Sequence, residues 1–374
     1  MTFLPLLNDT VKEVNVRLPT PDDVDLPWFD HTKLSALNTC PTWGMINNIK
    51  ALRIPGSGRA MALEAGSASH EFFAAVRVFE LYTNYPDHAG VIGSKLFKAE
   101  TWTNMCSHSL KQEDERTTGL NFCLEALYGS GFYDDPRDKR RTMSNIEESC
   151  IAYYDRWPWG KYPIYVQDED DPNCLVGIEI GMEFVIEFVM HPLHELSMRR
   201  GLALVPPKSY AYKYRGRLDG LHRDSNGVLM VQENKTASRL DQAWSMSFLM
   251  SHQVTGYCVG SALLTGEACN KGLVKGMAIP LPRSYDYGGL VDEVVERPPH
   301  LIAAWMQWVW DTTRIYEQFK DNPDAATRFT HSCNRYFRPC SLLPYCASDD
   351  DERETIMGEM EYAPWDPLDD KSKD

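Results

Sequence analysis

The sequence predicts an α/β protein in which helices flank a mixed central sheet. A helical segment at residues 63–82, adjacent strands between residues 178 and 237, and a second helical pattern from residue 238 lead to this prediction. The 374 residues are 43% hydrophobic, enough to bury one sizeable core or two modest ones. We expect one domain over residues 1–347, with a helical insertion at 83–172 and an acidic, flexible tail at 348–374.

The segment from Leu63 to Tyr82 is the first strong helix signal, because apolar residues recur along it without a proline, although their face is not cleanly amphipathic. It carries Gly66 and His70 in a Gly-x-x-x-His arrangement. A single histidine on such a helix is more often structural than a metal ligand. An earlier helix is expected to begin near Ser35 and run toward Leu52.

The stretch from residue 83 to 172 carries no motif that predicts a function. A helix is expected over residues 120–128, and four basic residues follow it. These are Arg137, Lys139, Arg140 and Arg141.

A strand is expected to begin at Ile178, because apolar residues alternate with glutamates as far as Phe188. The apolar residues predict a core face. Glu179, Glu183 and Glu187 fit its solvated face most simply, and the alternative is that Glu179 or Glu183 lies near a metal site.

A hairpin follows, with strands over residues 212–221 and 231–235. Asp224, Ser225, Asn226 and Gly227 form the turn between them, and Asn-Gly is a strong hairpin signal. Asp219 is expected to face Glu233 across the pair. Glu233 and Lys235 share one face of their strand, whereas Asn234 points to the other.

Two carboxylates at this distance repel each other unless a cation lies between them, and hard oxygen ligands suit Mg²⁺ or Mn²⁺. A lysine beside them would attend a nucleophilic water or a phosphate. The alternative is an ordinary hairpin with a surface aspartate and an exposed Glu/Lys pair. Lys213, Arg215 and Arg217 alternate along the strand that leads to Asp219, and are candidates for phosphate contacts of DNA.

One long helix is predicted from Ser238, as N-cap, to Gly266. Gln253 and Tyr257 are four residues apart and therefore share one face of it. A half-buried polar stripe would explain the pair equally well. A short strand at residues 277–281 and a helix at residues 299–320 complete the expected elements.

The Asp…Glu-x-Lys set followed by a helix with Gln-x-x-x-Tyr resembles the PD-(D/E)XK nuclease superfamily, in particular its RecB-type branch. The resemblance implies a restriction-endonuclease-like core and Lys235 beside the attacking water. It implies that Gln253 and Tyr257 position the substrate. The implied metal ligands are His70, Asp219, Glu233 and the backbone carbonyl of Asn234.

Ten cysteines are present, and their spacing shows no disulfide framework, as expected in a reducing cytoplasm. Cys333, Cys340 and Cys346 lie within fourteen positions that also contain Pro339 and Pro344. Metal sites of this kind need a fourth ligand. The resemblance to iron-sulfur members of the RecB-type branch implies that Cys40 is the fourth and that the cofactor is a [4Fe-4S] cluster; thiolate chemistry alone also permits zinc.

The formal net charge is −15, and the segment from Ser348 onward holds eleven acids against three bases. DNA binding depends largely on neutralising phosphates, so a net charge of −15 is unfavourable for a DNA-binding protein. Much of this negative charge is concentrated in the segment from Ser348 onward and not in the rest of the chain. A solvated terminus is the simplest interpretation. The alternatives are a mimic of DNA charge, or a docking segment for a protein partner through Tyr362 and Trp365.

The sequence therefore predicts a Mg²⁺- or Mn²⁺-dependent deoxyribonuclease, a hydrolase acting on DNA ends as an exonuclease. We expect no membrane partner, and a bacterial or phage-infected cytoplasm with a role in DNA recombination, DNA repair or phage DNA metabolism. The alternatives are a noncatalytic iron-sulfur DNA-binding or assembly subunit and a structure-specific endonuclease.

Overall fold

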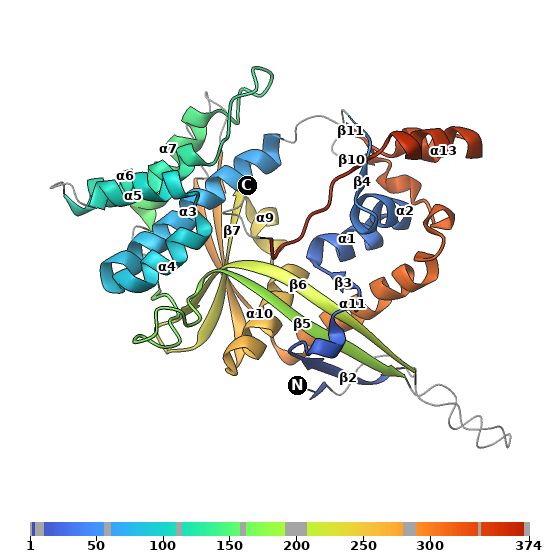
Figure 1. The fold of residues 1–374 in the computed structure, drawn as a ribbon, viewed down its shortest axis with the longest axis horizontal. Helices are drawn as coiled ribbons and strands as arrows, with labels where there is room; N and C mark the ends of the chain where they lie inside the picture. The colour runs from blue at the N-terminus through green and yellow to red at the C-terminus, as the bar shows by residue number, and fades with distance from the viewer. Residues whose placement is uncertain are drawn as a thin grey trace. The chain divides into compact units, whose positions relative to one another are not determined.

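The computed structural model describes residues 2–3, 11–55, 61–109, 114–157, 162–190, 208–279, 289–335 and 338–369. The chain forms two compact units (Figure 1). The first comprises Met1–Arg59, Glu183–Gly216 and Pro299–Leu368, and the second comprises Ala60–Met182, Arg217–Pro298 and Asp369–Asp374. Strands β5 (Ile178–Met190) and β6 (Lys208–Arg223) contribute residues to both units.

The second unit contains a mixed sheet. The end of β6 pairs antiparallel with β7 (Leu229–Ala237), β7 pairs in parallel with β8 (Cys269–Ala278), and β8 pairs antiparallel with β9 (Leu290–Glu296). The predicted turn joins β6 to β7, and Gly227 adopts the positive φ of 77° that favours glycine there. The expected α/β class with a mixed sheet and flanking helices is confirmed. β8 begins earlier than predicted, and β9 lacked a sequence signal.

Helices gather beside this sheet around an apolar core (Figure 1). The predicted helix at residues 63–82 is α3 (Met61–Asn84), and the predicted helix at 120–128 lies within α6 (Glu115–Gly129). Between and after them lie α4 (Pro86–Leu96), α5 (Ala99–Ser109) and α7 (Met143–Arg156). The described part of residues 83–172 is therefore largely helical.

The prediction of one helix from Ser238 to Gly266 is wrong. The structure contains α9 (Gln242–Met246), capped by Asp241, and α10 (His252–Thr265), capped by the Ser251 side chain. The guanidinium of Arg297 is buried and donates to the Phe248 carbonyl at 2.7 Å. This carbonyl lies at the break and also accepts from the Ser251 N–H at 3.2 Å, and the contact with Arg297 could not be read from the local sequence.

In the first unit, β2 (Val11–Arg17) pairs with β1 (Thr2–Phe3) and β5, and β3 (Trp28–Phe29) pairs in parallel with β6. α11 (Pro299–Phe319) matches the predicted helix at 299–320. Three short 3₁₀ segments, Pro21–Asp23, Pro323–Ala325 and Thr330–Ser332, join these elements.

The expected helix from Ser35 to Leu52 starts earlier and is divided. α1 (His31–Thr39) begins at His31 because the Asp30 side chain accepts from the Lys33 N–H at 2.9 Å. The extended backbone of Cys40 ends it. α2 (Pro41–Trp43) and a π-helical turn (Gly44–Ile49) follow.

The C-terminal part of the first unit contains short strands and helices. A hairpin of β10 (Asn334–Arg335) and β11 (Arg338–Pro339) precedes α12 (Leu343–Ala347). Within the acidic segment predicted to be flexible, α13 (Asp350–Glu359) is capped by Asp349, and β12 (Glu361–Tyr362) pairs with β4 (Leu52–Arg53). In the described ranges, no helix has the length and apolarity to cross a membrane.

Candidate metal site

Three ligand-type side chains converge in the second unit. His70 lies on α3, Glu179 at the start of β5 and Asp219 on β6. One ligand atom from each lies within 4.8 Å of the others. α3 approaches β7 closely: a Cβ on Gly66, one turn before His70, would lie 3.4 Å from the Thr236 hydroxyl. This distance is an ordinary van der Waals contact, so the helix that carries His70 packs directly against β7.

Asp219 is buried and held by two donors. His70 Nδ1 lies 3.3 Å from one carboxylate oxygen, and the Asn234 N–H donates to the other at 2.5 Å. Burial raises the pKa of Asp219, but His70, the Asn234 N–H and Lys235 outweigh burial, so this pKa is lowered. Burial likewise lowers the pKa of His70, and the Asp219 carboxylate more than reverses this effect. Asp219 is therefore held as an anion.

Glu233 lies on β7, with 3% of its surface exposed. One carboxylate oxygen contacts Lys235 Nζ at 2.5 Å, while the other, Oε2, has no hydrogen-bond partner among the described residues. Burial raises the pKa of Glu233 to about 7, Lys235 opposes this rise and Asp219 adds to it. A buried oxygen without a donor costs free energy, so Oε2 marks a place where a cation would be stabilising.

Glu179 is the residue that the strand pattern left undecided. Its φ is 47°, in the left-handed region that non-glycine residues rarely adopt. Its neighbours Ile178 and Ile180 are buried, as the alternation predicts. The structure places Glu179 beside His70 and Asp219, within the candidate metal site, and a role as metal ligand stays a prediction. Glu183 lies in the first unit and pairs with Arg215.

A hydrogen-bonded row leads from the carboxylates to α10. Lys235 Nζ donates to the Gln253 side-chain oxygen at 3.0 Å, and the Gln253 amide donates to the Tyr257 hydroxyl at 2.9 Å. The four-residue spacing on α10 places Gln253 and Tyr257 on one face. The structure thus brings together four of the predicted residues: Glu233, Lys235, Gln253 and Tyr257.

Asn234 is anchored from the opposite side of β7. The Tyr153 hydroxyl of α7 donates to its side-chain oxygen at 3.0 Å, and the Gln232 amide donates to the same atom at 3.1 Å. These contacts hold the backbone between Glu233 and Lys235. Tyr153 carried no sequence signal, because its partner lies 81 residues away. The contacts of the described residues do not show whether the Asn234 carbonyl is a metal ligand, so this role stays a prediction.

The three cations predicted as phosphate contacts all have protein partners. Lys213 is buried and donates to the Val24 carbonyl at 2.9 Å. Arg215 pairs with Glu183 and with Asp366, and Arg217 donates to the Asp369 carbonyl at 2.6 Å. These groups already contact carboxylates and carbonyls, so a phosphate would have to displace or share these contacts, and their role as phosphate contacts stays a prediction.

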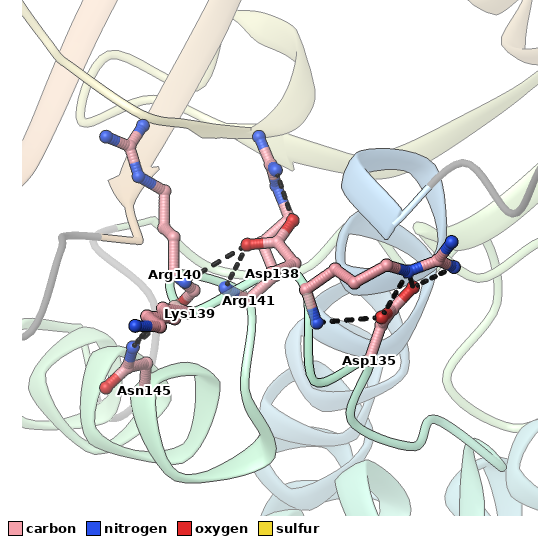
Figure 2. Close-up of polar contacts among 7 residues, drawn as sticks. Asp135, Asp138, Lys139, Arg140, Arg141 and Asn145 are labelled. Atoms are coloured by element: carbon pink, nitrogen blue, oxygen red, sulfur yellow. Dashed lines mark hydrogen bonds and ion pairs between the residues drawn. The ribbon is translucent and has the colours of Figure 1, made fainter.

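The second basic cluster lies in the connection between α6 and α7. Figure 2 shows the guanidinium of Arg141 against Asp138, 2.7 Å apart, and the contacts around Asp135 and Asn145. Arg137 pairs with Asp135 at 2.7 Å, although its own side chain is 86% exposed. Two of the four cations are thus neutralised locally.

The cysteines predicted to bind a cofactor lie in the first unit. The Cys340 N–H donates to the Cys333 carbonyl at 2.7 Å across the β10–β11 hairpin, and Cys346 lies on α12. Burial raises the pKa of Cys346, Arg328 opposes this rise, and Cys40, Cys340 and Cys333 add to it. The four thiols are therefore near one another. A cavity of about 170 Å³ is lined by Thr39, Cys40, Trp43, Ser332, Pro339, Cys340 and Ser341.

Comparisons with known proteins add little to this geometry. No protein-family profile matches the sequence, and no curated protein matches it. A solved structure described as "Crystal structure of SSO0001" aligns with 35% of this chain and 50% of its own, with 19% identity and a TM-score of 0.22. The match thus spans half of that protein and carries no argument about fold or function.

Proposed function

We propose that this chain is a metal-dependent DNA nuclease of the PD-(D/E)XK superfamily and its RecB-type branch. Two observations support the proposal. His70, Glu179 and Asp219 converge within 4.8 Å, and the buried Glu233, which interacts electrostatically with His70 and Asp219, has an oxygen without a hydrogen-bond partner among the described residues. A surface hairpin would not bury two carboxylates and leave one oxygen without a donor, because burying an unpaired oxygen destabilises the fold and no other contact compensates for this cost.

The donor set fits a divalent cation. Carboxylates suit Mg²⁺ and Mn²⁺, and an imidazole is better tolerated by Mn²⁺. Asp219, Glu233 and His70 would hold the ion, with Glu179 and the Asn234 carbonyl as further ligands. When bound, the cation would polarise a phosphate and lower the pKa of water.

The remaining groups of the site are suited to positioning. Lys235 holds its ammonium between Glu233 and Gln253, so a proton donor is fixed beside the carboxylates. Tyr257 accepts from the Gln253 amide and is 6% exposed. We assign to Lys235 the orientation of the attacking water and the stabilisation of the phosphate, and to Gln253 and Tyr257 the placement of the substrate strand.

The cysteine site supports a structural cofactor. Around a single zinc, Zn–S bonds of about 2.3 Å would bring the thiolates close together. No three of the described cysteine sulfurs lie within 4.8 Å of one another. A [4Fe-4S] cluster binds each thiolate through a different iron, so it accepts a wider spacing. Cys40, Cys333, Cys340 and Cys346 would hold it, and zinc is the alternative occupant.

Cleavage of two DNA substrates tests this function. End-labelled linear DNA and covalently closed circular DNA are incubated with Mg²⁺ or Mn²⁺ and with the wild-type protein, Glu233→Gln or the control Glu359→Gln on α13. Loss of linear DNA alone, abolished by Glu233→Gln and retained by Glu359→Gln, is expected for an exonuclease. Glu233-dependent cutting of the circle would identify an endonuclease instead. Cleavage of neither substrate would favour a noncatalytic DNA-binding or assembly subunit.

A further inference from the structure

One carboxylate of the C-terminal segment is held by cations beside an indole ring in the first unit. Asp366 forms an ion pair with NH1 of Arg215, while Nε of the same guanidinium pairs with Glu183. Lys33 Nζ lies 2.9 Å and Arg215 Cζ 4.9 Å from the centre of the Trp28 ring. Asp366 also acts electrostatically on Lys33. Two cations and an aromatic ring therefore surround one anion.

Separate elements position these groups. β3 pairs in parallel with β6, with Trp28 opposite Lys213, which brings the indole next to Arg215. Lys33 is fixed in the first turn of α1 by the Asp30 cap. The other oxygen of Asp366 accepts from the Leu368 N–H at 2.9 Å, so a turn of its own segment orients the carboxylate. The anion site is built by β3, α1 and β6, and Asp366 reaches it from a segment about 150 residues further along the chain than Arg215.

The chemistry of this site suits a phosphate. A guanidinium binds a phosphate oxygen with the geometry that it uses for a carboxylate, and a lysine adds a point charge. Basic residues interleaved with an aromatic ring are typical of surfaces that follow a nucleic-acid backbone and stack a base. Arg215 and Asp366 side chains are 19% and 25% exposed, so their pairing is less screened by salt than a surface pair.

We propose that Trp28, Lys33 and Arg215 form a phosphate-binding subsite for nucleic acid, and that Asp366 occupies this subsite as an internal competitor. The nature of the ligand rests on the proposed nuclease function. DNA must displace the segment around Asp366 before its phosphate reaches Arg215. The acidic C-terminal segment would thereby weaken binding of DNA that cannot make enough other contacts.

Fluorescence anisotropy of a short labelled DNA duplex, in EDTA so that no cleavage occurs, tests this competition. Asp366→Asn keeps the shape of the side chain and removes its charge. We expect it to tighten DNA binding about three- to tenfold, the range that corresponds to a partly buried ion pair. Glu354→Gln, on the exposed side of α13, removes the same charge from the same acidic segment and is the matched control. It should change the affinity much less.

The Arg215→Gln background locates the effect. There, Asp366→Asn should produce a much smaller gain, because the cation that pairs directly with Asp366 is gone and only the electrostatic effect on Lys33 remains. Hydrogen exchange of the wild-type protein supplies a second readout: DNA should accelerate exchange of the Leu368 amide, which is hydrogen-bonded to Asp366. If Asp366→Asn and Glu354→Gln raise the DNA affinity equally, the gain reflects only the lower net negative charge of the protein, and the proposal is overturned. Unchanged exchange on DNA binding would overturn it as well.

The binding experiment separates this inference from the nuclease function. A protein that binds DNA more tightly as Asp366→Asn but never cleaves it would retain the subsite and lose the nuclease assignment. A Glu233-dependent nuclease in which Asp366→Asn and Glu354→Gln behave alike would retain the nuclease assignment and lose the subsite. A protein that binds no duplex in any variant would lose both.

Discussion

Two replacements of Glu179 should differ in stability and share a loss of metal binding. The φ of 47° places Glu179 in a conformation that costs an L-residue about 1–2 kcal/mol. Glycine removes this cost but loses about 0.5–1 kcal/mol of chain entropy on folding. Alanine removes the same carboxylate and keeps the β-carbon. The Glu179→Gly protein should therefore exceed Glu179→Ala in unfolding free energy by about 1 kcal/mol.

Thermal unfolding in EDTA measures the first effect. A difference of about 1 kcal/mol corresponds to a shift in Tm of about 1 °C for a chain of this size. Addition of Mn²⁺ measures the second, because an ion that binds only the folded protein raises its Tm. Both variants should lose most of this Mn²⁺-dependent rise, since Glu179 approaches His70 and Asp219.

Two results would refute the reasoning. If Glu179→Gly is no more stable than Glu179→Ala in EDTA, the left-handed backbone does not strain the protein. If both variants keep the full Mn²⁺-dependent rise in Tm, Glu179 does not contribute to the metal site. Strained residues persist where surrounding structure over-determines them, and functional sites are where they cluster.

Three further predictions concern other parts of the molecule. Lys235→Ala should abolish DNA cleavage and leave the fold and DNA affinity largely intact, with a lower Tm because the buried Glu233 loses its contact; near-normal turnover would remove Lys235 from the mechanism. Burial raises the pKa of Glu80 to about 7, although Arg77 and Lys275 oppose this rise, so the folded protein favours the protonated carboxyl. The contribution of Glu80 to the free energy of unfolding is therefore fully present below pH 4.5 and is lost as the pH rises through about 7. Urea unfolding at pH 5 and pH 8 should show this loss in the wild type and a smaller one in Glu80→Gln; equal losses would exclude Glu80 as the cause. Cys340→Ser should lose bound iron and visible absorbance in anaerobic preparations, whereas Cys106→Ser on α5 should keep both; a colourless wild type with stoichiometric zinc would contradict the iron assignment.

Local sequence patterns determined the elements that carry the candidate site. The Asn-Gly turn, the alternation of apolar residues in β5 and the helical run of α3 each reflect interactions within a few residues. Strand alternation also separated Asn234 from Glu233 and Lys235. These features predicted the placement of Glu233, Lys235, Gln253 and Tyr257, because a strand period and a helix turn fix which side chains share a face.

Tertiary structure alone decided the remainder. Arg297 donates to a carbonyl at the break between α9 and α10, 49 residues before it, and Asp366 reaches Arg215 across 151 residues. The backbone of Glu179 turned a residue of an apparently solvated strand face toward His70. Contacts between distant segments depend on how whole elements pack, and no local pattern encodes the partner. The sequence by itself therefore determined which side chains could form the site, and packing decided which of them meet.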